Sequence, residues 1–91
     1  MAFFVYIIQS NVDQSYYKGF SESPMDRLLS HNSGMSSYTS AKLPWQFVYI
    51  EELETKRDAL IRERSLKKYS RSQIENLICS SKNILSKFSA G

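Results

Sequence analysis

The side chains of this chain that could do chemistry are of the types that bind and act on phosphate esters. An arginine is a permanent cation whose forked donors suit phosphate oxygens, and a histidine can move protons near neutral pH. A carboxylate could hold Mg²⁺ through its oxygens. With two strand tyrosines added, the candidate catalytic residues are Tyr6, Tyr17, Arg27, His31 and Glu63.

The positions of the two tyrosines depend on how the chain turns between them. Residues 11–14 have turn chemistry, so the segments on either side are predicted to form a hairpin. A loop of two or four residues places Tyr6 opposite Tyr17 or Gly19, with both phenols on one sheet face, whereas a three-residue loop separates them. Core packing, with the hydroxyls at the rim, is the commoner role of strand tyrosines.

Arg27 and His31 lie four positions apart in a segment expected to be helical, so they share one helix face. That face could present a fixed cation and a proton carrier to a phosphate group. The ordinary alternatives are a surface ion pair for Arg27 and stabilisation of His31 by the dipole at the end of the helix.

Glu63 is an acidic residue inside a basic helix. Its plain explanation is a salt bridge to Lys67, four residues later. The alternative is that its carboxylate holds Mg²⁺ while its basic neighbours contact the phosphate. A nearby acidic group, which includes Glu51, is interpreted as a strand end and its exposed edge.

Positive charge is concentrated in residues 56–71, although the net charge of the whole chain is only +3. This segment has seven basic and two acidic residues, and the remainder has five basic and seven acidic. A localised basic segment suits contact with a phosphate backbone, and a solvated helix face is the alternative. The candidate nucleic-acid-binding residues are Lys42, Arg62, Arg64, Lys67, Lys68 and Arg71.

These residues need strands and helices to position them. Segments rich in β-branched and aromatic residues predict strands over 3–9, 15–21 and 45–52. Capping patterns that begin at Ser23, Thr55 and Ser70 predict helices over 24–32, 56–68 and from 71 onward, and Gly34 should stop the first. The apolar residues expected on one side of the last helix are Ile74, Leu77, Ile78 and Leu85. The order is strand, strand, helix, strand, helix, helix. This α+β arrangement requires helices to cover at least one face of the sheet.

Length, cysteine content and hydropathy of the 91 residues limit the possible domain number, covalent links and membrane segments. They allow one domain, expected over residues 1–85, with a frayed tail over 86–91. The single cysteine, Cys79, excludes a disulfide or cysteine zinc site within one chain and fits a reducing compartment. No apolar run approaches a membrane span, and residues 1–8 lack signal-peptide features. We therefore expect a cytoplasmic protein without a membrane contact.

Taken in order along the chain, the residues resemble a known family. Val5-Tyr6-Ile7 resembles the first half of the GIY-YIG signature, and Tyr17-Lys18-Gly19 resembles the second. Arg27 follows Tyr17 by ten residues, which is the spacing of that family's helix arginine. Further matching segments are Arg27 to Asn32, Gly34, Ser37-Tyr38-Thr39, Pro44-Trp45, Val48-Tyr49, Glu51-Glu52, Ala59 to Glu63 and Leu66 to Tyr69. The chain is thus similar to small standalone proteins related to the nuclease domain at the N-terminus of the UvrC excision-repair subunit.

The resemblance implies a three-stranded antiparallel sheet flanked by helices, with the active site on one sheet face. It implies that Tyr6 and Tyr17 flank the scissile phosphate, that one of them helps to deprotonate the attacking water, and that Arg27 stabilises the phosphate charge. Glu63 would be the single carboxylate on Mg²⁺ or Mn²⁺, and His31 matches a position that assists in some members. The implied activity is an endonuclease acting on DNA more than RNA, with DNA repair or recombination as its implied setting.

Two positions depart from the family signature. Val5 stands for its first glycine, and Lys18 stands for the aliphatic residue in the middle of its second half. If Tyr17 faces the site, Lys18 points to the other face, which is then less buried or accommodates the lysine stem. No added DNA-reading domain is present in these residues, so sequence specificity should be poor. A non-catalytic nucleic-acid-binding module on the same fold, or a subunit without a nucleic-acid role, is the alternative.

Overall fold

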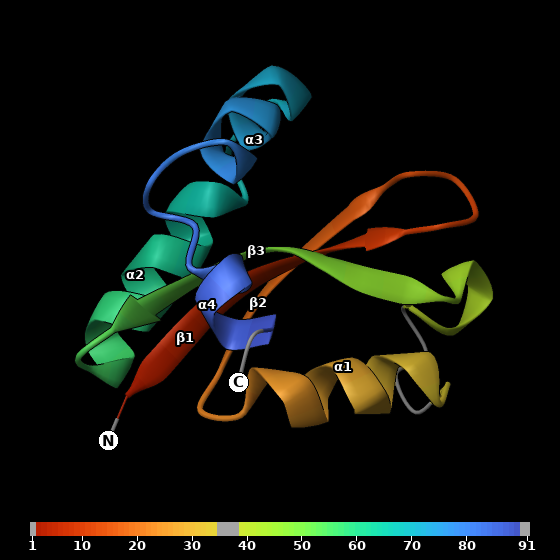
Figure 1. Cartoon of the computed structure of the whole chain (residues 1–91), viewed down its shortest axis with the longest axis horizontal. Coiled ribbons are helices and arrows are strands. Elements are labelled where there is room, and N and C mark those ends of the chain that lie inside the picture. Colours follow the sequence, from red (N-terminus) through yellow and green to blue (C-terminus); the bar gives the residue numbers. More distant parts are fainter. Residues whose placement is uncertain (1, 35–38, 90–91) are drawn as a thin grey trace.

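A computed structural model describes residues 2–34 and 39–89 of the chain (Figure 1). At its centre lies an antiparallel sheet with the strand order β2-β1-β3, which comprises β1 (Phe3–Ser10), β2 (Tyr16–Ser21) and β3 (Trp45–Leu53). The helices are α1 (Pro24–Asn32), α2 (Lys56–Leu66), α3 (Arg71–Ile78) and α4 (Leu85–Ser89), with a short 3₁₀ helix η1 (Ser40–Lys42) before β3. The predicted α+β class, antiparallel sheet and flanking helices are confirmed. Ser37 and Tyr38, part of the family resemblance, lie outside the described residues.

The central strand β1 is buried on both of its faces because helices cover each side of the sheet. Its Val5 and Ile7 pack into a core formed with α2 and α3, and Tyr6 and Ile8 pack into a second core on the opposite face. That second core receives side chains from α1 and from the α4 segment. Figure 1 shows α1 and the α2–α3 pair on opposite sides of the strands.

The hairpin between β1 and β2 places the two tyrosines as an even loop predicts. Tyr6 pairs with Gly19 and Ile8 pairs with Tyr17, so successive residues alternate between the two faces. Tyr6 and Tyr17 therefore lie on the same face, on the side of α1. Lys18 lies on the other face, opposite Ile7, as expected for a neighbour of Tyr17.

The helix starts, and the end of α1, follow the predicted signals with one exception. Pro24 occupies the start of α1, and Gly34 follows its end with a φ of 81°, the left-handed conformation that glycine tolerates best. Thr55 caps α2, and Ser70 forms a full capping box with Gln73. Ser23, which was also expected to cap, makes no side-chain capping bond. Helix α1 therefore starts at Pro24, whose fixed φ suits the first helical position, without a side-chain cap.

The C-terminal prediction was wrong in three respects. Helix α2 ends at Leu66 instead of 68, and the predicted last helix is two pieces separated by a turn. The Asn83 side chain explains that break, because it bonds the backbone of β3 at Val48 and Ile50 as well as the carbonyl of Ile78. The chain thereby passes the edge of β3 and places Leu85 in the core on the Tyr6 face. Residues 85–89 form α4, where a frayed tail was expected from 86.

Candidate active site

Tyr6 occupies the centre of the α1 side of the sheet, and its ring crosses directly over Gly19. A Cβ at Gly19 would lie 2.7 Å from the Tyr6 hydroxyl oxygen and 2.8 Å from the ring carbon that carries it. Only glycine leaves space for this crossing, although its backbone is ordinary strand. The tyrosine is 1% exposed, and Phe47 packs against its ring edge at a centroid distance of 6.1 Å. The phenol position is therefore fixed by packing.

His31 projects from α1 beneath the same phenol and is 1% exposed. Its Nε2 lies 3.2 Å from the Tyr6 hydroxyl, and its Nδ1 lies 2.9 Å from the Thr39 hydroxyl. The Tyr17 ring packs edge-on against the imidazole at a centroid distance of 4.9 Å. Burial, with a smaller contribution from the charge of Arg27, lowers the pKa of His31. The ring is therefore neutral at pH 7 and donates one of its two hydrogen bonds while accepting the other.

Arg27 and Glu63 act on the same phenol from two different helices. Burial raises the pKa of Tyr6, whereas a hydrogen bond and positive charge from Arg27 oppose that rise. The charges of Tyr17 and Glu63 raise it further, which places both side chains within electrostatic reach of the Tyr6 hydroxyl. The structure thus brings Arg27 and His31 to one hydroxyl group. Tyr17 packs on His31, and Glu63 acts on the phenol through its charge. The net rise keeps the phenol protonated at neutral pH.

Glu63 reaches this position from α2, which covers the other face of the sheet. Its side chain is 18% exposed, and its Oε1 lies 4.0 Å from the Lys67 ammonium. This is the predicted salt bridge, and its N–O distance is at the upper limit for an ion pair. The carboxylate therefore retains oxygens that can bind another cation. The plain and the functional interpretations of Glu63 are therefore compatible.

The residues present fit a single hard divalent cation. Among the described residues, no group of three or more histidine, cysteine, aspartate or glutamate side chains could form a protein cage for a metal ion. Mg²⁺ is commonly held by one or two carboxylates, with water and substrate phosphate completing its shell. Glu63, beside the arginine and phenols of the site, could supply the one protein ligand that such a shell needs.

The structure corrects the prediction that Arg62 binds nucleic acid. Its Nε lies 3.0 Å from Glu51 Oε1, and its Nη1 donates to the Tyr69 hydroxyl at 3.3 Å. Both partners in the ion pair are under one-fifth exposed, and Tyr49 donates to the same carboxylate at 2.5 Å. Glu51 therefore does not lie on the exposed strand edge that the sequence suggested. Arg62 joins β3 to α2 and to the turn between α2 and α3, and it is not available to a phosphate backbone.

Lys42 and Arg71 also have partners in the fold, although both remain accessible. Lys42 forms an ion pair with Asp13 at 3.2 Å. Arg71 donates to the Gln14 carbonyl at 3.2 Å and lies over the Tyr16 ring at 4.9 Å from its centroid. Both side chains thus help to hold the β1–β2 hairpin, so any contact with nucleic acid would come in addition to that role.

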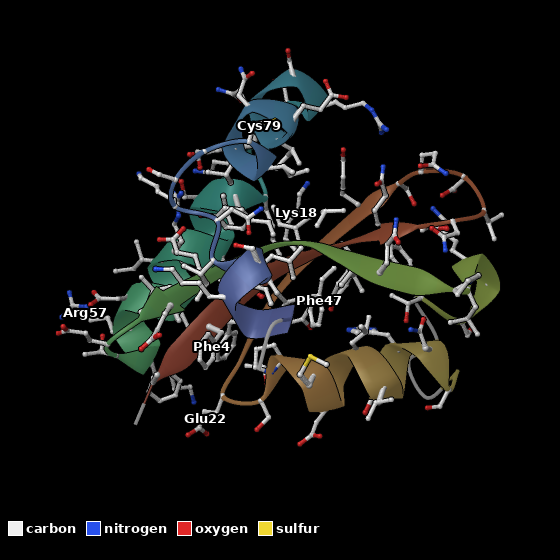
Figure 2. All side chains as sticks on the ribbon, viewed as in Figure 1. Phe4, Lys18, Glu22, Phe47, Arg57 and Cys79 are labelled. Carbon is white, nitrogen blue, oxygen red and sulfur yellow. The ribbon has the colours of Figure 1, made fainter. Side chains whose placement is uncertain are left out.

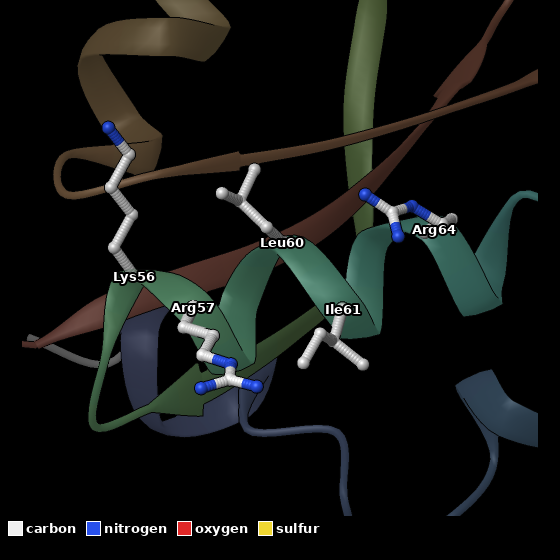
Figure 3. A pocket seen from close by; sticks show the side chains of 5 residues that line it. All are labelled: Lys56, Arg57, Leu60, Ile61 and Arg64. Carbon is white, nitrogen blue, oxygen red and sulfur yellow. The ribbon is translucent and has the colours of Figure 1, made fainter.

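The remaining predicted basic residues lie on or beside α2. Lys67 and Lys68 follow its last turn and are exposed, and Arg64 points outward from its middle. Figure 3 shows Arg64 on the same side of the helix as Lys56 and Leu60, with Arg57 and Ile61 completing the pocket wall. Sequence reasoning counted Lys56 and Arg57 in the basic segment but did not select them as contacts.

Thr39 is the site residue that sequence reasoning missed. It is fully buried, its hydroxyl contacts His31, and its carbonyl accepts a hydrogen bond from the Trp45 indole at 2.9 Å. No spacing rule links a residue in an irregular segment to a helix eight residues earlier.

Across the described part of the chain, none of the helices has the length and apolar character needed to cross a membrane.

Comparison with known proteins identifies relatives that span most of the chain. A UPF0213 protein of Staphylococcus epidermidis is 41% identical over 71 residues, covering 77% of this chain and 85% of the relative. A UPF0213 protein of Clostridium perfringens is 40% identical over 82 residues, covering 89% and 86%. The solution NMR structure of a UPF0213 protein from Bacillus halodurans aligns with a TM-score of 0.58 at 29% identity, covering 90% and 87%. None of these names states an activity.

The family comparison is more specific about the chemistry. The profile of the GIY-YIG catalytic domain matches residues 2–76, which include every candidate catalytic residue and all three strands. This superfamily is one of nucleases. On this match and on the relatives that cover most of its length, the chain belongs to the GIY-YIG catalytic domain family.

Proposed function

We propose that this protein is a metal-dependent endonuclease that hydrolyses phosphodiester bonds in DNA with weak sequence preference. The observation that carries the proposal is the convergence of Tyr17, Arg27, His31 and Glu63 on the hydroxyl of Tyr6. These four side chains come from three separate elements, β2, α1 and α2. A purely structural role for Tyr6 does not need a cation, a carboxylate and a neutral imidazole around it.

Arg27 binds a non-bridging oxygen of the scissile phosphate in this proposal. It is exposed on α1 while it also reaches the Tyr6 phenol, so its guanidinium lies between solvent and the buried site. A fixed cation that meets the phosphate as negative charge develops stabilises the transition state more than the ground state. Tyr17, on the edge strand β2, flanks the phosphate from the other side.

The buried hydrogen bond between Tyr6 and His31 offers a path for the proton of the attacking water. The water gives its proton to the Tyr6 oxygen as Tyr6 passes its own proton to Nε2 of His31, while Nδ1–H donates to Thr39. The water oxygen forms a bond to phosphorus, the bond to the leaving nucleotide oxygen breaks, and that oxygen takes a proton from solvent. The lowered pKa of His31 keeps Nε2 free to accept at neutral pH.

Glu63 would hold the divalent cation, Mg²⁺ or Mn²⁺. When bound, such an ion supplies positive charge that neutralises the phosphate oxygens during displacement. Lys67, at 4.0 Å, can remain beside the carboxylate because one Glu63 oxygen suffices for the cation.

The proposal is tested with a panel of labelled duplex, single-stranded and branched DNA, together with RNA of the same sequences. Each substrate is incubated with the protein in Mg²⁺, in Mn²⁺ and in EDTA, and the products are resolved by length. Cutting of DNA that requires the metal ion supports the proposal. Salt-sensitive binding without any cutting would favour a non-catalytic nucleic-acid-binding module, and neither binding nor cutting would reject both.

A further inference from the structure

A second polar pocket lies next to the candidate active site, at the exposed edge of β2. It has a volume of about 360 Å³ and is lined by Tyr16, Tyr17, Lys18 and Lys67. Tyr17 faces the α1 side of the sheet, whereas Tyr16 and Lys18 face the α2 side, so the pocket wraps around the edge of the strand. It therefore shares one wall with the site and opens toward the end of α2.

Lys18 is an unexpected residue at this position. Figure 2 labels Lys18 on the α2–α3 side of the strands. Its neighbours on the same face, Tyr16 and Phe20, pack against the apolar core, and it pairs across the sheet with the fully buried Ile7. Its side chain is half-buried, and burial lowers the pKa of its ammonium group. No hydrogen bond or ion pair joins it to another described residue. A partly buried cation without a partner is costly, which an arriving anion would offset.

Lys67 connects this pocket to the catalytic residues. Its ammonium lies 4.0 Å from Glu63, and its side chain is 60% exposed. Glu63 is the carboxylate that acts on the Tyr6 phenol, so Lys67 stands one residue away from the reacting centre. The other titratable groups that line the pocket are the phenols of Tyr16 and Tyr17, which leave its charge positive.

We propose that Lys18 and Lys67 bind a second phosphate of the substrate strand, next to the scissile one. The inference rests on the proposed function and deepens it, because it says how the strand leaves the catalytic centre: around the edge of β2 toward the end of α2. An ammonium makes a point-charge contact with phosphate and reads no base, which agrees with weak sequence preference. Lys18 is thus a positioning residue and does not touch the reacting atoms.

The test uses Lys18→Met, which keeps the apolar stem and removes the charge. Binding of a labelled DNA duplex is measured by fluorescence anisotropy over a range of salt concentrations in EDTA, and KM and kcat are measured in Mg²⁺. Loss of one phosphate contact should reduce the slope of log affinity against log salt by about 0.7 to 0.9. KM should rise while kcat changes by less than about twofold, because the contact is equal in ground and transition states.

Two further variants separate the charge from the fold. Lys18→Arg keeps a cation and should retain most of the salt slope. Lys82→Met removes a lysine from a different pocket, which Tyr69 and Gln73 also line, and should leave the slope unchanged. Equal thermal unfolding of all variants would show that the sheet is intact. If Lys82→Met loses as much slope as Lys18→Met does, the loss reflects the net charge of the protein and not a phosphate contact at Lys18.

The substrate side of the contact is tested with neutral methylphosphonate linkages placed one at a time beside the cut. One linkage other than the scissile one should weaken binding as much as Lys18→Met does, and it should have no further effect in that variant. Binding with an unchanged slope in Lys18→Met would overturn this inference and leave the proposed nuclease intact. Absence of DNA binding by the unaltered protein would overturn both.

Discussion

The two faces of the sheet bury different kinds of side chain. The face under α2 and α3 buries Val5, Ile7, Leu66 and other apolar groups, with Tyr49 as its polar exception. The face under α1 also buries apolar residues, but it encloses His31, which contacts both Tyr6 and Thr39. Because both faces are built on the same strand, β1, one face can supply stability while the other retains polar groups in a fixed arrangement.

The same contrast appears in two arginines. Arg62, on α2, is under one-fifth exposed and is neutralised by Glu51. Arg27, on α1, is exposed and forms no ion pair among the described residues, although it reaches the Tyr6 phenol. An arginine whose charge is already satisfied contributes to the fold, and one whose charge is unsatisfied can meet a phosphate. The variants below should therefore affect turnover on one face and stability on the other.

The largest expected effect is on turnover. Arg27→Ala should lower kcat by about two decades or more, the scale for losing one transition-state charge donor. Its free energy of unfolding should change little, because the side chain is exposed. Cleavage assays and urea unfolding measure the two quantities, and Arg57→Ala, another exposed arginine, is the matched control. A mild effect on kcat would make Arg27 structural.

Arg62→Met should show the opposite behaviour. Removing this guanidinium leaves Glu51 partly buried without its cation, which should lower the free energy of unfolding by about 2 kcal/mol while kcat is unchanged. The Nη2 of Arg62 is buried without a hydrogen-bond partner among the described residues, so the pair is imperfectly satisfied. The double variant with Glu51→Gln should therefore recover much of the loss. Unaltered stability in Arg62→Met would remove the distinction between the two arginines.

The smallest expected effect concerns pH. The pKa of His31 is lowered from its ordinary 6.5 by burial, so the unfolded chain binds this proton more tightly than the folded one. The free energy of unfolding should then fall as pH drops from about 6.5 through the folded pKa. His31→Gln should flatten that part of the stability curve and lower kcat by about tenfold. A curve of unchanged shape between pH 6.5 and 5 would exclude the titration of His31 from it.

Much of the fold follows from local patterns in the sequence. The spacing of four predicted that Arg27 and His31 lie together on α1. The parity of the hairpin stayed open in the sequence, and the structure shows the even loop that places Tyr6 and Tyr17 on one face. The helix signals at Thr55, Ser70 and Gly34 were confirmed for the same reason, since each depends on backbone groups within a few residues.

The features that the sequence did not reveal depend on distant contacts. The pairing of Arg62 with Glu51 joins a helix to a strand, and the break before Leu85 depends on Asn83 bonding the edge of β3. Thr39 reaches His31 from an irregular segment that has no periodicity. The surroundings of Glu63 in the sequence left a salt bridge and a Mg²⁺ ligand both open, and the family resemblance favoured the ligand. The catalytic roles of Glu63 and of the other four candidate catalytic residues stay predictions.

The most direct test of the nuclease account is metal-dependent cleavage by Glu63→Gln. The substituted amide keeps the size of the side chain and removes the charge that would hold the cation. Glu75→Gln is the matched control, because Glu75 is an exposed acidic residue paired with Arg71 on α3. The account predicts that Glu63→Gln folds normally and does not cut DNA in Mg²⁺ or Mn²⁺, while Glu75→Gln cuts as the unaltered protein does. Full cleavage by Glu63→Gln would contradict it.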